Sequence, residues 1–122
     1  MLQMFTPIRI KDMEVRNRIT LPPMCMYCAD ENGMPNERHF VHYVSRAVGG
    51  AGLIIMEATG VLPRGRISDH CLGLWNDEQA AAVGKIVRAC QARSRLSTPP
   101  APSPSAATTR PRGRSAGRRS PR

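Results

Sequence analysis

Residues 36–60 read NERHFVHYVSRAVGGAGLIIMEATG, and this stretch decides the class of fold. Asn36 suits the N-cap of a helix, and Gly49 and Gly50 suit its end. The segment between them predicts an amphipathic helix, because apolar side chains recur at i, i+3, i+4, i+7 and i+8, namely Phe40, Tyr43, Val44, Ala47 and Val48. Residues 53–56 then form a continuous apolar run, which is typical of a parallel strand covered on both faces. A helix followed by such a strand indicates an α/β fold.

The residues before this stretch predict a hairpin and a further strand. Residues 8–15 (IRIKDMEV) alternate apolar and charged side chains on both sides of a two-residue Lys-Asp turn. Residues 18–21 form a short β-favouring run that ends at Pro22 and Pro23, because proline cannot donate to a sheet ladder. A strand therefore ends immediately before a loop that contains Met, Cys and Tyr.

The residues after the stretch predict a second helix and then a break. Asn76 is a suitable N-cap, Gln79 follows it as in a capping box, and the apolar face consists of Val83, Ile86, Val87 and Cys90. About 34 residues separate the two strand starts, as expected for βαβ units. Two parallel strands with one helix each leave unpaired edges, so a third strand should follow. The sequence after Ala92, RSRLSTPP, has no strand pattern, and the predicted fold is interrupted there.

The net charge of +9 in this chain of 122 residues is concentrated at one end. Residues 93–122 contain eight arginines, no acidic residue and six of the eleven prolines, whereas residues 1–92 carry ten basic and nine acidic side chains. The C-terminal segment cannot offset its ordering entropy by burial, so we predict a patterned unit over 1–92 and a disordered Arg/Pro/Ser/Ala-rich tail over 93–122. These residue types dominate when GC-rich coding DNA is translated in a wrong frame, and a frameshift is our leading hypothesis for the tail.

The sequence shows no sign of secretion or of membrane insertion. The first ten residues lack an apolar core and are interrupted by Pro7 and Arg9. The most apolar run, residues 53–56, is far shorter than the roughly 20 residues that a spanning helix needs. We therefore predict a cytoplasmic protein whose cysteines serve as thiols and not as a disulfide framework, namely Cys25, Cys28, Cys71 and Cys90.

Several short motifs follow one another at consistent separations. They are FTPI at 5–8, NRI at 17–19, PMCMY at 23–27, HY at 42–43, LIIMEA at 53–58, RGRI at 64–67, and LGLW at 72–75 followed by DE at 77–78. In this order they resemble the opening of the old yellow enzyme family, most closely its bacterial, thiol-containing branch of NADPH-dependent flavin oxidoreductases. The resemblance covers nearly all of residues 4–92, and several ordered motifs are far more specific than one short pattern.

The resemblance implies the N-terminal hairpin and the first two βα units of a TIM (β/α)8 barrel, which binds FMN at the carboxyl ends of its strands. A flavin needs a flat slot, and the polarity of this slot tunes the electron affinity of the flavin. Pro22 and Pro23 would stiffen the slot. The thiol would be a weak hydrogen-bond donor that stabilises charge on the reduced flavin, and not a nucleophile. Many bacterial relatives carry a small polar residue at the position of Pro22. Here the backbone carbonyl of Pro22 is the flavin contact that remains. By resemblance, the flavin contacts are Pro22, Pro23, Met24, Cys25 and Ala58, and Tyr27 faces the substrate.

The same resemblance implies a reaction in which NADPH passes hydride to the flavin and the flavin passes it to the β-carbon of an activated alkene. Complete relatives are expected to be homo-oligomers that act on small molecules. The family's substrate-carbonyl donors, its proton-donating tyrosine and its phosphate loops lie beyond the last matching residue. We therefore assign no catalytic residue to this chain, and we expect a fragment that is inactive alone and holds no FMN tightly.

Other interpretations of the polar residues compete with this one. Cys25 and Cys28 also form a C-x-x-C pattern, which is typical of a dithiol pair or of half a zinc site. They lie in a loop after two prolines and not at a helix start, so we favour separate thiols. His39 and His42 are three residues apart on the predicted helix, and we interpret them as packing or hydrogen-bonding residues and not as metal ligands.

The basic residues leave one alternative function open. We interpret Arg64 and Arg66 as solvated charges and not as phosphate ligands. The arginines of residues 93–122 indicate a second class, a small basic protein whose disordered arm binds nucleic acid by neutralising phosphates. This arm has no aromatic side chain for stacking on bases, so its binding would be salt-sensitive and indifferent to sequence.

Overall fold

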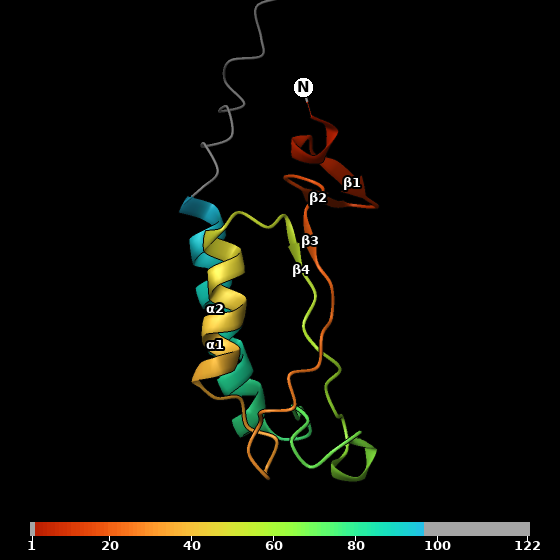
Figure 1. The fold of residues 1–122 in the computed structure, drawn as a ribbon, viewed down its shortest axis with the longest axis vertical. Coiled ribbons are helices and arrows are strands. Elements are labelled where there is room, and N and C mark those ends of the chain that lie inside the picture. The colour runs from red at the N-terminus through yellow and green to blue at the C-terminus, as the bar shows by residue number, and fades with distance from the viewer. Residues whose placement is uncertain (1, 97–122) are drawn as a thin grey trace, which may run out of the picture.

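The computed structural model describes residues 2–96, and within them a hairpin precedes an alternation of parallel strands and helices (Figure 1). The predicted order of hairpin, strand, helix, strand and helix is confirmed. Residues 97–122, most of the predicted tail, lie outside the described residues. The elements are β1 (Ile8–Ile10), β2 (Met13–Val15), β3 (Thr20–Leu21), α1 (Glu37–Val48), β4 (Leu53–Ile54) and α2 (Asp77–Leu96), with short 3-10 helices at Gln3–Phe5 and Pro63–Gly65.

Strands β1 and β2 form the predicted antiparallel hairpin. Ile8 lies opposite Val15, and Ile10 lies opposite Met13. Lys11 adopts the left-handed region with φ 53°, which allows the tight two-residue turn. The hairpin lies at the amino-terminal end of β3 and β4 (Figure 1), so it leaves the opposite, carboxyl edge of these strands free.

Strands β3 and β4 are parallel, as the sequence predicts. Thr20 pairs with Leu53 and Leu21 with Ile54, and the Ile55 amide donates to the Leu21 carbonyl at 3.0 Å. Both strands are shorter than the predicted runs 18–21 and 53–56. β3 ends at Leu21 as predicted, because Pro22 has no N–H to continue the ladder, but it begins two residues later, and β4 ends two residues earlier. Beyond the paired residues the two segments continue side by side toward the same end of the molecule (Figure 1).

Helix α1 begins and ends at the predicted residues. The Asn36 side chain accepts the Arg38 amide at 3.0 Å, and the Asn36 amide donates to the ring of His39 at 3.2 Å, which makes a capping box. At the other end the Gly49 amide donates to the Ser45 carbonyl at 2.8 Å. α1 packs beside α2 on one side of the two parallel strands (Figure 1).

Helix α2 has the predicted start but a later end. The Gln79 amide donates to Asn76 Oδ1 at 2.9 Å, and Gln79 Oε1 accepts the Asn76 amide at 3.3 Å. The helix runs to Leu96, so residues 93–96 are helical and differ from the predicted boundary at 92. Adding a residue to an existing helix costs little, and the Ser94 carbonyl also accepts a hydrogen bond from Arg16 at 2.9 Å.

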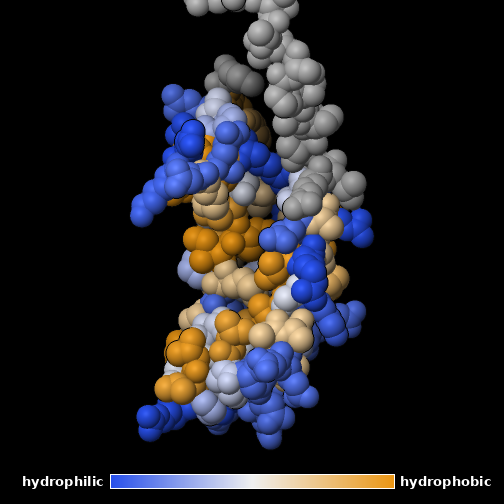
Figure 2. All heavy atoms as spheres, turned by 180° about the vertical axis from the view of Figure 1, so that it is seen from behind, coloured by the Kyte–Doolittle hydropathy of each residue, from blue (hydrophilic) through white to orange (hydrophobic). Residues whose placement is uncertain are grey.

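The core of the described chain is small and open on one side. Tyr43 and Ala47 of α1, Ile86 of α2 and Leu72 of the intervening loop are buried. Ile55, in the apolar run predicted to be covered on both faces, is 44% exposed. Figure 2 shows apolar side chains gathered over the middle of the rear face. A groove of about 500 Å³, lined by β4, α1, α2 and β2, also remains open. This is the surface of a sheet and helix layer that lacks further neighbours.

Candidate functional site

The predicted flavin contacts lie where the two parallel strands end. Residues 22–25 follow β3 and Ala58 follows β4, and parallel strands send both segments to the same edge of the sheet. Beyond the last strand pair, the Met26 amide donates to Oε2 of Glu57 at 2.9 Å, which joins the two segments. The structure therefore places Cys25 and Ala58 at the same end of the parallel pair.

The surface that these residues form is apolar. Pro22, Pro23, Met24 and Ala58 are exposed, and Cys25 is half-buried. Proline, methionine and alanine side chains suit the face of a planar aromatic ring, and a thiol can donate weakly to a ring carbonyl. The residues present thus fit one wall around a flavin ring. Residues 22–27 include no basic side chain, so this wall would contact the ring and not the phosphate.

Tyr27, the predicted substrate-facing residue, lies beside Cys25. Its backbone has φ 50°, which is uncommon for a bulky side chain, and 49% of its surface is exposed. The pKa of the Tyr27 phenol is raised, first by the charge of Cys25 and also by a hydrogen bond between the two side chains. The loop therefore brings both side chains together on a strained backbone, as functional loops often do.

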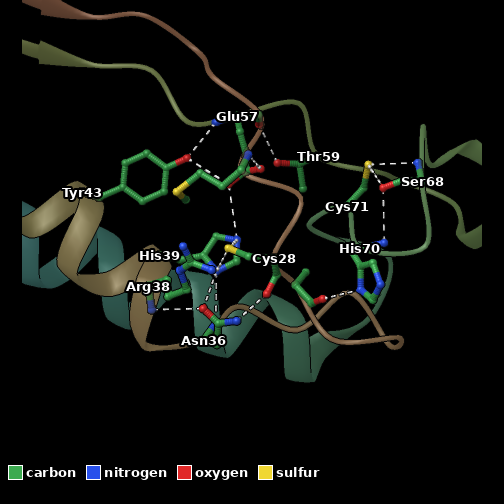
Figure 3. A network of polar contacts seen from close by, with 12 residues as sticks. Cys28, Asn36, Arg38, His39, Tyr43, Glu57, Thr59, Ser68, His70 and Cys71 are labelled. Atoms are coloured by element: carbon green, nitrogen blue, oxygen red, sulfur yellow. Dashed lines mark hydrogen bonds and ion pairs between the residues drawn. The ribbon is translucent and has the colours of Figure 1, made fainter.

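A buried carboxylate follows strand β4 and connects this edge with helix α1 (Figure 3). Glu57 is 3% exposed. The Tyr43 hydroxyl donates to Glu57 Oε1 at 3.4 Å and accepts the Glu57 amide at 2.9 Å. Burial raises the pKa of Tyr43 to about 12, so its hydroxyl keeps its proton at neutral pH. His39, also on α1, is the other residue near this carboxylate, and its Nε2 lies 3.3 Å from Glu57 Oε1.

His39 extends this network to the start of α1. With the proton on Nε2, the ring donates to Glu57 while Nδ1 accepts the Asn36 amide at 3.2 Å. Burial lowers the pKa of His39, although Glu57 acts in the opposite direction, and the ring is neutral at neutral pH. The prediction that His39 packs and hydrogen-bonds is confirmed. His42 packs edge-on against Tyr43, with ring centroids 4.9 Å apart.

The cysteines of the C-x-x-C pattern have different partners. Cys25 acts on the pKa of Tyr27, whereas Cys28 Sγ lies 3.8 Å from both ring nitrogens of His39. Burial raises the pKa of the Cys28 thiol, and all four cysteines of the chain are free. Residues 22–28 form a loop, as predicted. Within the described residues, no group of three or more His, Cys, Asp or Glu side chains is arranged to hold a metal ion.

Arg66 was predicted to be a solvated charge, and this prediction is wrong. Its Nη1 donates to the carbonyls of Glu31 at 2.9 Å and Asp69 at 2.8 Å, and its guanidinium lies 5.4 Å from the ring centroid of Trp75. The side chain is only 18% exposed. Arg66 thus ties the loop before α2 to the loop before α1, a contact between residues 35 positions apart.

Glu57 was not among the predicted site residues. In the sequence it is the residue that directly follows the apolar run 53–56. A carboxylate at the end of a covered strand needs hydrogen-bond partners, and His39 and Tyr43 lie four residues apart on the preceding helix. A carboxylate at a strand end, together with a His and a Tyr four residues apart on the preceding helix, was the sequence signal that could have identified Glu57.

The geometry defines a class of protein. A parallel β-α-β unit with a hairpin at its amino end and an apolar, thiol-containing surface at its carboxyl edge matches the first part of a β/α barrel. Residues 3–96 match the sequence profile of the NADH:flavin oxidoreductase / NADH oxidase family. The chain belongs to this family.

Two NADPH dehydrogenases illustrate the sequence similarity. The chain is 51% identical over 88 residues to that of Listeria monocytogenes serotype 4b (strain CLIP80459), covering 71% of this chain and 26% of that protein. It is 51% identical over 85 residues to that of Bacillus subtilis (strain 168), covering 69% of this chain and 25% of that protein. The chain thus spans about a quarter of the length of these curated relatives.

Solved structures confirm the fold class. The Old Yellow Enzyme from Pichia sp. AKU4542 superposes with a TM-score of 0.71 at 26% identity, over 75% of this chain and 24% of that one. The old yellow enzyme homologue from Zymomonas mobilis gives 0.68 at 34% identity, over 75% and 25%. The described residues are the hairpin and the first two βα units of a TIM barrel, and the predicted family is confirmed. Neither helix within residues 2–96 has the length and apolar content to cross a bilayer.

Proposed function

We propose that this chain supplies one wall of the FMN site of an NADPH-dependent oxidoreductase that reduces activated alkenes. When bound, FMN would accept hydride from NADPH and deliver it to the substrate. The observation that carries the proposal is the joint edge after β3 and β4, where the Met26 amide bonds to Glu57 and brings Cys25 and Ala58 to one end. The NADPH dehydrogenases of Listeria and Bacillus support the choice of reductant.

The residues of this wall have distinct proposed roles. Pro22, Pro23 and Met24 pack against the flavin from the end of β3, and Ala58 packs from the end of β4. Cys25 donates its thiol proton to a flavin carbonyl and so adjusts the reduction potential without exchanging electrons itself. Their neighbour in the loop, Tyr27, lies on the substrate side beside Cys25.

The complete protein is proposed to be a cytoplasmic homo-oligomer that acts on small molecules. The alternative of a nucleic-acid-binding arm receives no support from the relatives of this chain. That alternative depends on residues 93–122, of which 97–122 lie outside the described part. We propose that the isolated chain neither turns over nor holds FMN tightly, because a single wall leaves most of the ring and the phosphate in water.

A chimera tests this function directly. Residues 4–92 of this chain would replace the matching segment of the Listeria NADPH dehydrogenase. We expect a yellow protein that retains FMN on gel filtration and oxidises NADPH with an activated alkene as acceptor. The isolated 122-residue chain, purified with excess FMN, should be colourless because it has only one wall. A soluble, folded chimera without FMN would contradict the proposal, and so would an FMN-loaded isolated chain.

Within the chimera, Cys25→Ala tests the role of the thiol. Loss of a donor to the flavin carbonyl should shift the flavin absorption band and its reduction potential, and should change turnover several-fold. Cys90→Ala is the matched control, because Cys90 lies on α2 away from this edge. Equal spectra and potentials for the two variants would remove Cys25 from the flavin site.

The proposed origin of the tail has its own test. Resequencing the gene across codons 90 to 95 is expected to reveal a one-base correction that restores an apolar strand and a long open reading frame. Neighbouring frames that stop at once, or that lack a strand pattern, would contradict the frameshift.

A further inference from the structure

Glu57 uses both carboxylate oxygens, and it uses them toward different parts of the fold. Oε2 accepts the Met26 amide at 2.9 Å, from the loop that follows β3. Oε1 faces helix α1, with the Tyr43 hydroxyl at 3.4 Å and His39 Nε2 at 3.3 Å. The carboxylate therefore lies between helix α1 and the loop that follows β3 (Figure 3).

The main chain of Glu57 is also held on both sides. Its amide donates to the Tyr43 hydroxyl at 2.9 Å, and its carbonyl accepts the Thr59 hydroxyl at 2.9 Å. Ala58 follows directly and is spanned by the Glu57–Thr59 hydrogen bond. Glu57 thus constrains the segment that carries Ala58 through its backbone and contacts the loop of Cys25 and Tyr27 through its side chain.

We propose that Glu57 is a positioning residue, which fixes the loop after β3 against the segment after β4 so that Cys25, Tyr27 and Ala58 face one site. This inference rests on the proposed function for the identity of the site, but the contact itself is a property of this chain.

A carboxylate suits this position better than a side chain that only joins α1 to β4 would. Beyond Leu21 the loop has left the sheet ladder, and the Met26 amide takes its partner from a side chain 31 residues away. A charge-assisted acceptor is roughly twice as strong as a neutral one, which helps to hold a loop whose Tyr27 has φ 50°. A residue that only tied α1 to β4 would need Oε1 alone, so the second oxygen is the distinguishing feature.

Amide hydrogen exchange of the full 122-residue chain, followed by NMR, tests the proposal without any flavin. In the parent chain the Met26 amide should exchange slowly, as should Ile55, which donates to Leu21 in the sheet. Glu57→Ala should accelerate exchange at Met26 at least ten-fold while Ile55 keeps its protection. Glu57→Gln should give an intermediate exchange rate at Met26, because its amide oxygen can replace Oε2 as acceptor but carries no charge. Glu14→Gln, the same change at an exposed strand residue, is the matched control and should alter neither amide.

Two results would overturn the proposal. One is unchanged exchange at Met26 in a folded Glu57→Ala variant. The other needs no variant: a Met26 amide that exchanges as in an unstructured chain, beside a protected Ile55, would show that Glu57 does not hold the loop. A Met26 amide that depends on Glu57, together with a chimera that binds no FMN, would retain the positioning role and refute the flavin site, so the two failures are distinguishable.

Discussion

Replacing Gly52 with alanine is expected to destabilise the chain by about 2 kcal/mol, a large fraction of the stability of so small a core. Gly52 immediately precedes β4, and its amide donates to the Ile19 carbonyl at 2.9 Å, just before β3. A Cβ atom at this position would lie 2.5 Å from the backbone oxygen of Asn17 and would also meet the Asn17 side chain. Because a backbone atom is involved, the strain is relieved only if the starts of β3 and β4 move apart.

Urea unfolding followed by circular dichroism measures this effect, with Gly65→Ala as the matched control. A Cβ at Gly65 meets nothing closer than the Leu62 Cβ at 3.9 Å, so its free energy of unfolding should stay within about 0.5 kcal/mol of the parent. The displacement in Gly52→Ala should also separate the segments after the strands, and the protection of the Ile55 amide should fall. Equal midpoints for the two alanine variants would show that the strand starts are not held at this distance.

The elements that the sequence predicted correctly depend on local interactions. The N-cap Asn36, the stop at Gly49 and the Lys-Asp turn of the hairpin involve residues within a few positions of one another, and each has its expected geometry. The parallel pairing was also predictable, because a continuous apolar run after a helix is typical of a parallel strand. The strand lengths were not, since they depend on neighbouring strands that the described residues do not include.

The features that the sequence analysis missed depend on contacts between distant residues. Arg66 carries a charge and would be solvated on most surfaces, but the fold brings the Glu31 carbonyl to it across 35 positions. The role of Glu57 likewise follows only once the Met26 amide and helix α1 are placed on its two sides. In the candidate site, the resemblance named the residues that would face a cofactor, and the structure added Glu57, which we propose positions them.

The same buried network predicts that the chain loses stability in mild acid. His39 is fully buried, and burial lowers its pKa despite the neighbouring Glu57. Burial also lowers the pKa of His42, with Arg46 acting in the same direction. In the unfolded chain both histidines titrate near their ordinary value of about 6.5. Below that pH the unfolded state binds more protons than the folded state, so the free energy of unfolding falls as the pH drops, until the lowered folded-state pKa values are reached.

Urea midpoints measured at pH 7.5, 6.5 and 5.5 test this dependence, and we expect the lowest midpoint at pH 5.5. Within the network, His39→Gln removes the titrating ring but keeps a polar group, so it should flatten the dependence, although the variant is less stable at every pH because Glu57 and Asn36 lose their ring partner. His70→Gln is the control, since His70 lies outside this network with its Nδ1 at the Ala29 carbonyl, 3.1 Å away, and it should leave most of the slope in place. A higher midpoint at pH 5.5 than at pH 7.5 would mean that a protonated His39 paired with Glu57 dominates. The attraction between the two charges would then exceed the cost of burying them, which is the opposite of the balance that complete burial of the ring indicates.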